Sequence, residues 1–260
     1  MAVIDRHPPG SFCWIELATT DQASAKKFYT SLFDWKVNEF PMGPGEMYTI
    51  FRMDDRDAAA AYTLRPDQRS QGIPPHWLLY ISVNSADDAA AKAAQLGGKV
   101  CAPPFDVMDV GRMAVIQDPT NTVFAVWESK KHQGIGVAGV PGSLCWADLS
   151  TPDPARAQPF YEGLFGWKIS AGEKDPSGYL HIQNGETFIG GVAPAQFRDP
   201  QAPPHWLIYY YVSDVDASTD KAKQLGASVY MAPMSMEKVG RMSVVADPQG
   251  AVFALFKEQH

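Results

Sequence analysis

Apolar residues in the N-terminal part of the chain change their spacing in a regular order. Residues 11–18 alternate between two faces in the manner of a strand, and Asp21 then occupies the position of a helix N-cap. Apolar residues next recur at helical spacing, before strand candidates near residues 36–40, 47–53 and 58–64. The pattern predicts a strand, a helix and three strands, which together make a βαβββ module.

The same order of elements then restarts. A strand is predicted over residues 77–83 and a helix over residues 85–96, where Gly97 and Gly98 favour a helix end. Three more strand candidates lie near residues 99–102, 112–116 and 123–127. The first half of the chain is therefore predicted to contain two βαβββ modules.

The second half of the chain repeats the first. Residues 10–37 align without gaps with residues 142–169, and more than half of the aligned positions are identical. The string PPHWLLYISV that begins at Pro74 likewise matches PPHWLIYYYV, which begins at Pro203. Self-similarity on this scale indicates a duplicated domain, so we expect an α+β fold of four βαβββ modules.

A stretch rich in glycine and polar residues separates the two copies. We place the first domain at residues 1–128, the linker at 129–141 and the second domain at 142–260. A βαβββ module leaves one face of a curved sheet uncovered by its helix, so two modules side by side enclose a cleft that can hold a ligand. The sequence leaves open whether modules pair within a half or between halves.

Composition and charge exclude several classes of function. The net charge of −7 and the absence of a basic run argue against a nucleic-acid partner. The chain lacks the apolar stretch of a signal peptide or a membrane span, so we expect a cytoplasmic protein with no membrane partner. Cys13, Cys101 and Cys145 have neither the spacing of a zinc knuckle nor the even number of a disulfide framework.

One motif resembles a known family. The signature WxELxTxDxxxAxxFYxxLFxW spans residues 14–35, and the variant WADLSTPD begins at Trp146. In both halves, an Asp-Pro pair precedes a segment containing VFA. The chain thus resembles the vicinal-oxygen-chelate superfamily of glyoxalases, bleomycin-resistance proteins and dioxygenases. The resemblance implies two glyoxalase-like domains with curved mixed sheets around clefts. The enzymes of this superfamily hold a divalent metal in the cleft.

The positions that the resemblance assigns to metal ligands hold other residue types in this chain. They fall on Trp14, Leu78 and Ala125 in the first half, and on Trp146, Leu207 and Ala254 in the second. A metal needs nitrogen, oxygen or sulfur lone pairs, which these side chains do not supply. We therefore expect neither a metal nor another cofactor.

Residues that share a face with these positions are predicted to line the clefts. An aromatic-rich pocket with one carboxylate per half suits a flat organic ligand that carries positive charge. The alternative is that the tryptophans are core residues and that the carboxylates satisfy backbone groups. The candidate ligand-binding residues are Trp14, Glu16, His76, Leu78, Tyr80, Ala125, Trp127, Trp146, Asp148, His205, Leu207, Tyr209, Ala254 and Phe256.

Three histidines admit two interpretations each. His76 and His205 follow Pro-Pro in both halves, where the imidazole can act as a base at the cleft mouth or bond a backbone carbonyl at a strand entry. His181 has no histidine counterpart in the first half. The sequence leaves open whether His181 has a functional or a structural role.

Three functions remain in competition. The leading hypothesis is a metal-independent protein that binds a small aromatic or cationic organic molecule. The alternatives are an enzyme of the superfamily, either a glyoxalase-type lyase or isomerase or an oxygenase or hydroxylase, and a scaffold whose clefts are filled by their own aromatic side chains. Because four modules can complete both clefts internally, we expect a monomer or a weak homodimer with a small-molecule ligand as its partner.

Overall fold

The computed structural model describes residues 2–43, 45–172 and 177–259, and it contains the predicted order of elements in both halves. Asp21 caps the first helix as expected, because its side chain accepts a hydrogen bond from the Ser24 amide at 2.9 Å. The elements of the first half are β1 (Ala2–Val3), β2 (Phe12–Thr19), α1 (Gln22–Phe33), β3 (Lys36–Gly43), β4 (Glu46–Met53), β5 (Arg56–Thr63), α2 (Pro66–Ser70), β6 (His76–Ser82), α3 (Ala86–Gln95), β7 (Lys99–Val107), β8 (Gly111–Gln117) and β9 (Val123–Ser129).

The second half repeats this order after a short strand in the linker. No described helix is long and apolar enough to cross a membrane. The elements are β10 (Val137–Ala138), β11 (Leu144–Ser150), α4 (Pro154–Phe165), β12 (Lys168–Ala171), β13 (Leu180–Asn184), β14 (Thr187–Val192), the 3₁₀ turn η1 (Ala195–Phe197), β15 (His205–Tyr211), α5 (Val215–Gln224), β16 (Ser228–Met236), β17 (Gly240–Ala246) and β18 (Val252–Glu258).

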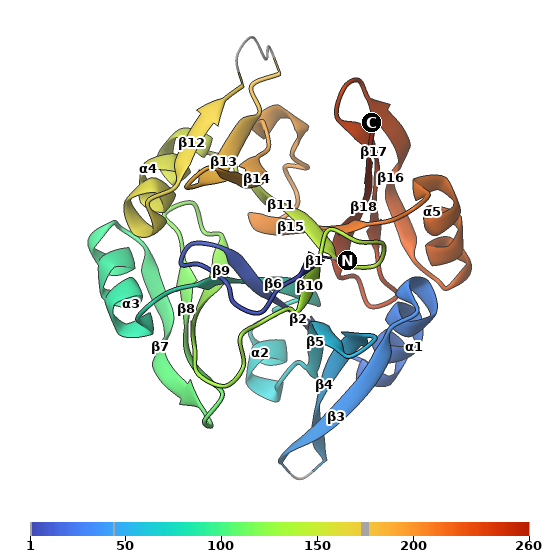
Figure 1. Cartoon of the computed structure of the whole chain (residues 1–260), viewed down its shortest axis with the longest axis horizontal. Helices are drawn as coiled ribbons and strands as arrows, with labels where there is room; N and C mark the ends of the chain where they lie inside the picture. The colour runs from blue at the N-terminus through green and yellow to red at the C-terminus, as the bar shows by residue number, and fades with distance from the viewer. Residues whose placement is uncertain (1, 44, 173–176, 260) are drawn as a thin grey trace.

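Each half forms one open, mixed sheet of eight strands, so the predicted α+β fold is confirmed. The strand orders are β3-β4-β5-β2-β6-β9-β8-β7 and β12-β13-β14-β11-β15-β18-β17-β16. In both sheets the first strands of the two modules pair antiparallel, β2 with β6 and β11 with β15. Modules therefore pair within a half, and the four modules surround the centre of the molecule (Figure 1).

One strand in the first half runs further than the sequence pattern indicated. We expected a strand to end at Ala102, before two prolines, whereas β7 continues to Val107. The pairing of β7 with β8 shifts register between Ala102 and Phe105, where the prolines lie. Proline has no amide hydrogen to donate, so the strand passes it by a bulge at the sheet edge.

The two halves are locked together by buried polar contacts that the duplication supplies twice. The Tyr29 hydroxyl on α1 donates to Asp247 Oδ2 of the other half at 2.9 Å and accepts from Trp77 Nε1 at 3.1 Å. Trp35 Nε1 donates to the Gly142 carbonyl, and Trp167 Nε1 donates to that of Gly10. Because each half anchors tryptophans of the other, the halves form one packed unit.

The segment predicted as a linker is packed against the first sheet. The Ile135 amide donates to the Cys13 carbonyl and the Gly136 amide to the Asp57 carbonyl, both at 2.8 Å. The Ile135 side chain is only 2% exposed. Gly134 has a φ of +110°, and a Cβ atom there would lie 2.1 Å from the Cys13 carbonyl oxygen.

We expect Gly134→Ala to destabilise the fold much more than Gly250→Ala. Both glycines have a positive φ, but nothing lies within 4 Å of a Cβ atom at Gly250. Backbone strain alone should cost about 1–2 kcal/mol at either position, and the clash with the Cys13 carbonyl adds to it only at Gly134. Urea unfolding followed by circular dichroism measures the difference. Equal losses in the two variants would contradict this packing of the linker.

Candidate functional site

A half-buried carboxylate in the first half accepts hydrogen bonds from tyrosines on two other strands of the sheet. Glu16 on β2 receives the Tyr48 hydroxyl of β4 at 2.6 Å and the Tyr80 hydroxyl of β6 at 2.8 Å, one on each oxygen. Trp14 Nε1 donates to the Tyr48 hydroxyl at 3.3 Å. We call Trp14, Glu16, Tyr48 and Tyr80 the first carboxylate cluster.

The second half builds the same arrangement around an aspartate. Asp148 on β11 receives the Tyr179 hydroxyl at 2.5 Å and Trp146 Nε1 at 3.0 Å on Oδ1, and the Tyr209 hydroxyl of β15 at 2.8 Å on Oδ2. We call Trp146, Asp148, Tyr179 and Tyr209 the second carboxylate cluster. Three donors converge on this carboxylate, whereas two converge on Glu16.

Strand alternation explains why these side chains meet. Residues two apart on a strand share a face, so Trp14 lies on the same side of the sheet as Glu16. The antiparallel register sets Tyr80 opposite Trp14, and in the second half it sets Tyr209 opposite Trp146. The adjacent strands β6 and β15 thus bring the Tyr80 and Tyr209 hydroxyls within reach of the carboxylates.

Burial dominates the electrostatics of both clusters. Desolvation raises the pKa of Glu16 and that of Asp148, and the tyrosine hydrogen bonds oppose this rise in part. Burial and the adjacent carboxylate also hold the pKa of Tyr80 and of Tyr209 well above the ordinary tyrosine range. The tyrosines therefore remain protonated donors at neutral pH.

The donor sets of the clusters do not fit a divalent metal. Each cluster offers a single carboxylate, and both of its oxygens already accept hydrogen bonds. Within the part of the chain that the structure describes, no group of three or more His, Cys, Asp or Glu side chains is placed to hold a metal ion. Divalent metals in this kind of cleft need several nitrogen, oxygen or sulfur ligands.

The structure brings most of the predicted cleft residues together around these clusters. The Trp127 ring lies 6.4 Å from that of Tyr80, and the Phe256 ring lies 6.3 Å from that of Tyr209, both edge-on. Ala125 pairs with Tyr80 and Ala254 with Tyr209 across parallel strands. Leu78 and Leu207 stand opposite the two carboxylate residues on the adjoining strand. Ligand binding by these residues stays a prediction.

His76 and His205 show the backbone interaction that their Pro-Pro-His context allowed. The Nδ1 atom of His76 lies 2.8 Å from the Pro74 carbonyl oxygen, and that of His205 lies 2.9 Å from the Pro203 oxygen. Burial lowers the pKa of both imidazoles. Each histidine thus fixes the entry to a strand, β6 or β15.

Three residues of the clefts escaped the sequence analysis. Tyr48, near the start of β4, and Tyr179, just before β13, occupy matching positions of the repeat. Comparison of the two halves could have found them, whereas alternation along β2 could not. His132 comes from the linker, and its ring meets the Trp14 ring edge-on at 4.6 Å. The sequence around His132 has no strand or helix periodicity that would predict this contact.

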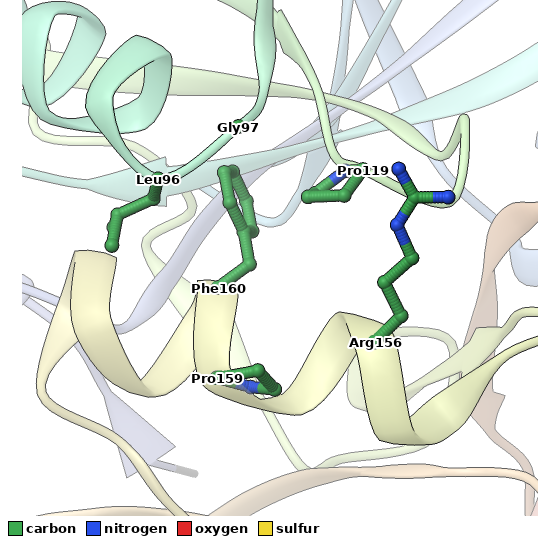
Figure 2. Close-up of a pocket in the computed structure, with 6 residues that line it drawn as sticks. All are labelled: Leu96, Gly97, Pro119, Arg156, Pro159 and Phe160. Atoms are coloured by element: carbon green, nitrogen blue, oxygen red, sulfur yellow. The ribbon is translucent and has the colours of Figure 1, made fainter.

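Two hollows in the described part of the chain lie away from the clusters. One of about 270 Å³ is lined by Leu96, Pro119, Arg156 and Phe160 at the junction of α3 with α4 (Figure 2). Another of similar size lies beside Phe33 at the opposite junction of the halves.

Comparison with known families identifies the family to which the chain belongs. Residues 11–126 match the family described as the glyoxalase/bleomycin resistance protein/dioxygenase superfamily, and residues 146–256 match a glyoxalase-like domain. The chain belongs to this superfamily. The resemblance noted in its signature motif is thereby confirmed.

Two relatives with different names align with nearly the whole length of this chain. The "Putative glyoxylase CFP32" of Mycobacterium tuberculosis is 37% identical over 94% of this chain and 93% of its own length. The anthracycline biosynthesis protein DnrV of Streptomyces peucetius is 32% identical over 96% of this chain and 94% of its own length.

Solved structures share the fold at low sequence identity. The Mn(II)-bound glyoxalase of Novosphingobium aromaticivorans has a TM-score of 0.67 and 16% identity, over 97% of this chain and 83% of that one. The 2,3-dioxygenase LapB of Pseudomonas sp. KL28 has a TM-score of 0.66 and 12% identity, over 96% and 94%. These likenesses show that the fold is shared.

We expect the stability that Asp148 contributes to fall as the pH rises. Because burial raises its pKa in the folded chain, the folded state holds the proton more tightly than the unfolded state does. The contribution is therefore complete below the ordinary carboxyl range, near pH 4, and is lost as the pH rises through the raised pKa. Urea unfolding of the unaltered protein and of Asp148→Asn, compared from about pH 4 to 8, isolates this group.

The exposed residue Asp216 supplies a control of opposite sign. Its pKa is lowered by the hydrogen bond from Arg241, so its contribution appears as the pH rises and is lost on acidification. The difference from Asp216→Asn should therefore grow with pH. A pH-independent difference for Asp148→Asn would contradict the raised pKa.

Proposed function

We propose that this superfamily member binds a flat aromatic molecule carrying positive charge, and that it does so without a metal. The observation that carries the proposal is the pair of carboxylate clusters on the cleft faces of the two sheets. Each combines aromatic walls with one acceptor group in a largely apolar environment. A flat ligand can stack on such walls while its charged donor approaches the carboxylate.

The hydrogen-bond capacity of the carboxylates supports a cationic ligand. A carboxylate has about four acceptor sites, and Asp148 uses three of them. The neighbouring tyrosines supply neutral donors, so they leave the negative charge of an ionised carboxylate unpaired. An ammonium or guanidinium group that reaches the cleft would gain strength from the low local dielectric.

The relatives support the aromatic character of the ligand. DnrV and DauV are named as anthracycline biosynthesis proteins, and each aligns with 96% of this chain. Anthracyclines are flat polycyclic aromatic compounds that carry an amino sugar. Such a compound matches both properties inferred from the clusters, and it is a suitable probe.

We expect daunorubicin to bind with a micromolar dissociation constant that metal chelators leave unchanged. Titration followed by anthracycline fluorescence and by calorimetry, with and without EDTA, measures this affinity. A neutral aromatic compound without the amine should bind at least tenfold more weakly, because it cannot use the carboxylate. Binding that requires added Mn²⁺ or Zn²⁺ would contradict the proposal, and absence of all binding would favour a scaffold with filled clefts.

A second candidate function is acid–base catalysis in the second half. The His181 ring lies 5.0 Å from that of Tyr179, whose hydroxyl donates to Asp148. His181 and Asp148 both pair with Gly191, from opposite sides, so they lie in one row across the sheet. A histidine, a tyrosine and a carboxylate in this order can move a proton to or from a bound substrate.

Turnover assays test this candidate with the hemithioacetal of methylglyoxal and glutathione and with catechols, each with and without added metal. If the second half catalyses a reaction, Tyr179→Phe and His181→Gln should each lower kcat at least tenfold. Tyr48→Phe, the matched substitution in the first half, should leave it within twofold. Activity that survives both second-half substitutions would exclude this constellation.

A further inference from the structure

We infer that the two clefts have separate roles: residues 130–136, here called the strap, close the first cleft, and the second cleft takes the aromatic ligand. The inference rests on the proposed function for the identity of the ligand. The closure itself rests on contacts within the chain.

The strap covers the aromatic wall of the first cleft. The His132 ring meets the Trp14 ring at 4.6 Å and 86°, and it lies 6.0 Å from the Trp127 ring. Trp127 Nε1 also donates to the His132 carbonyl oxygen at 3.0 Å. The strap thus occupies the aromatic surface on which a flat ligand would stack.

Polar contacts on both sides hold the strap in place. His132 Nε2 lies 3.4 Å from Asp57 Oδ2, and the Ile135 and Gly136 amides bond β2 and the start of β5. His7 Nε2 lies 2.9 Å from the Ile135 carbonyl oxygen. A segment with this many backbone partners is part of the packed structure and does not open at little cost.

Residues at matched positions of the repeat differ in solvent exposure, as closure of the first cleft by the strap requires. Trp14 is 5% exposed and Cys13 is fully buried, whereas Trp146 and Cys145 are half-buried. The same contrast holds for two further pairs, since Leu78 and Trp127 are buried while Leu207 and Phe256 are half-buried. The aromatic wall of the second cleft is therefore reachable from solvent in the described part of the chain.

The carboxylates follow the opposite order, because Asp148 is 6% exposed while Glu16 is half-buried. In the second cleft the carboxylate thus forms the floor beneath an accessible aromatic wall. In the first cleft the wall is covered. A stacking ligand needs the accessible wall, so we assign the site to the second cleft.

Residue differences between the halves fit this division. Tyr209, Met242 and Ala254 form an apolar cluster separate from the main core, with Met231 and Met236 packed against it. The repeat aligns Met231 with Ala102, and Met236 with Val107. Methionine adapts its shape to flat ligands more readily than alanine or valine, which suits a binding wall.

The test compares matched variants in a daunorubicin titration. We expect one molecule bound per chain, affinity weakened at least tenfold by Trp146→Ala or Asp148→Asn, and a change within twofold for Trp14→Ala or Glu16→Gln. Circular dichroism confirms that each variant is folded. Two equal sites per chain, or greater weakening by the first-half variants, would overturn the assignment.

Closure by the strap is tested without any ligand. Alkylation with iodoacetamide, mapped by mass spectrometry, should modify Cys145 at least tenfold faster than Cys13, with the exposed Cys101 as the reference for reagent activity. His132→Gly should accelerate modification of Cys13 at least fivefold and leave that of Cys145 unchanged. Equal rates for the two cysteines would overturn the closure, whereas failure of daunorubicin binding with the expected rates would count against the proposed function alone.

Discussion

The antiparallel pairing of β2 with β6, and of β11 with β15, is the constraint on which the rest of the structure depends. It joins two modules into one sheet and sets Leu78 opposite Glu16 and Tyr80 opposite Trp14. A slip of one residue would turn Glu16 to the face that Ile15 occupies, among the buried apolar side chains. The charge would then have no hydroxyl partner, so the register that builds the cleft also avoids a large desolvation cost.

The chain uses tyrosine hydroxyls to satisfy buried carboxylates at the junction of its halves as well as in its clefts. Tyr29 donates to Asp247 across the junction, while the turn amides of Gln249 and Ala251 occupy the other oxygen. A hydroxyl satisfies a carboxylate without burying a second charge, which would add a desolvation penalty of its own. The same pairing cross-links strands in the clefts and domains at the junction.

Much of the fold followed from the sequence, because strand and helix periodicity and the duplication are local or repetitive signals. Glu16 and Tyr80 could be placed on one face because alternation along neighbouring strands requires only the register of two motifs. Tyr48 could not, since β4 is two strands from β2 and its reach depends on side-chain length. His132 lies in a segment without periodicity, where long-range contacts alone decide the conformation.

Duplication allows one chemical arrangement to have different roles in the two halves. In the first, Glu16 binds Tyr48 and Tyr80, so it ties β4, β2 and β6 together whether or not a ligand enters. That structural role alone can explain why this position holds a carboxylate. In the second, Asp148 has a similar role, but the neighbouring residues Trp146 and Phe256 are half-buried where their first-half counterparts are buried. The carboxylate alone therefore does not identify a ligand site, and accessibility of the neighbouring wall is the property that separates the two.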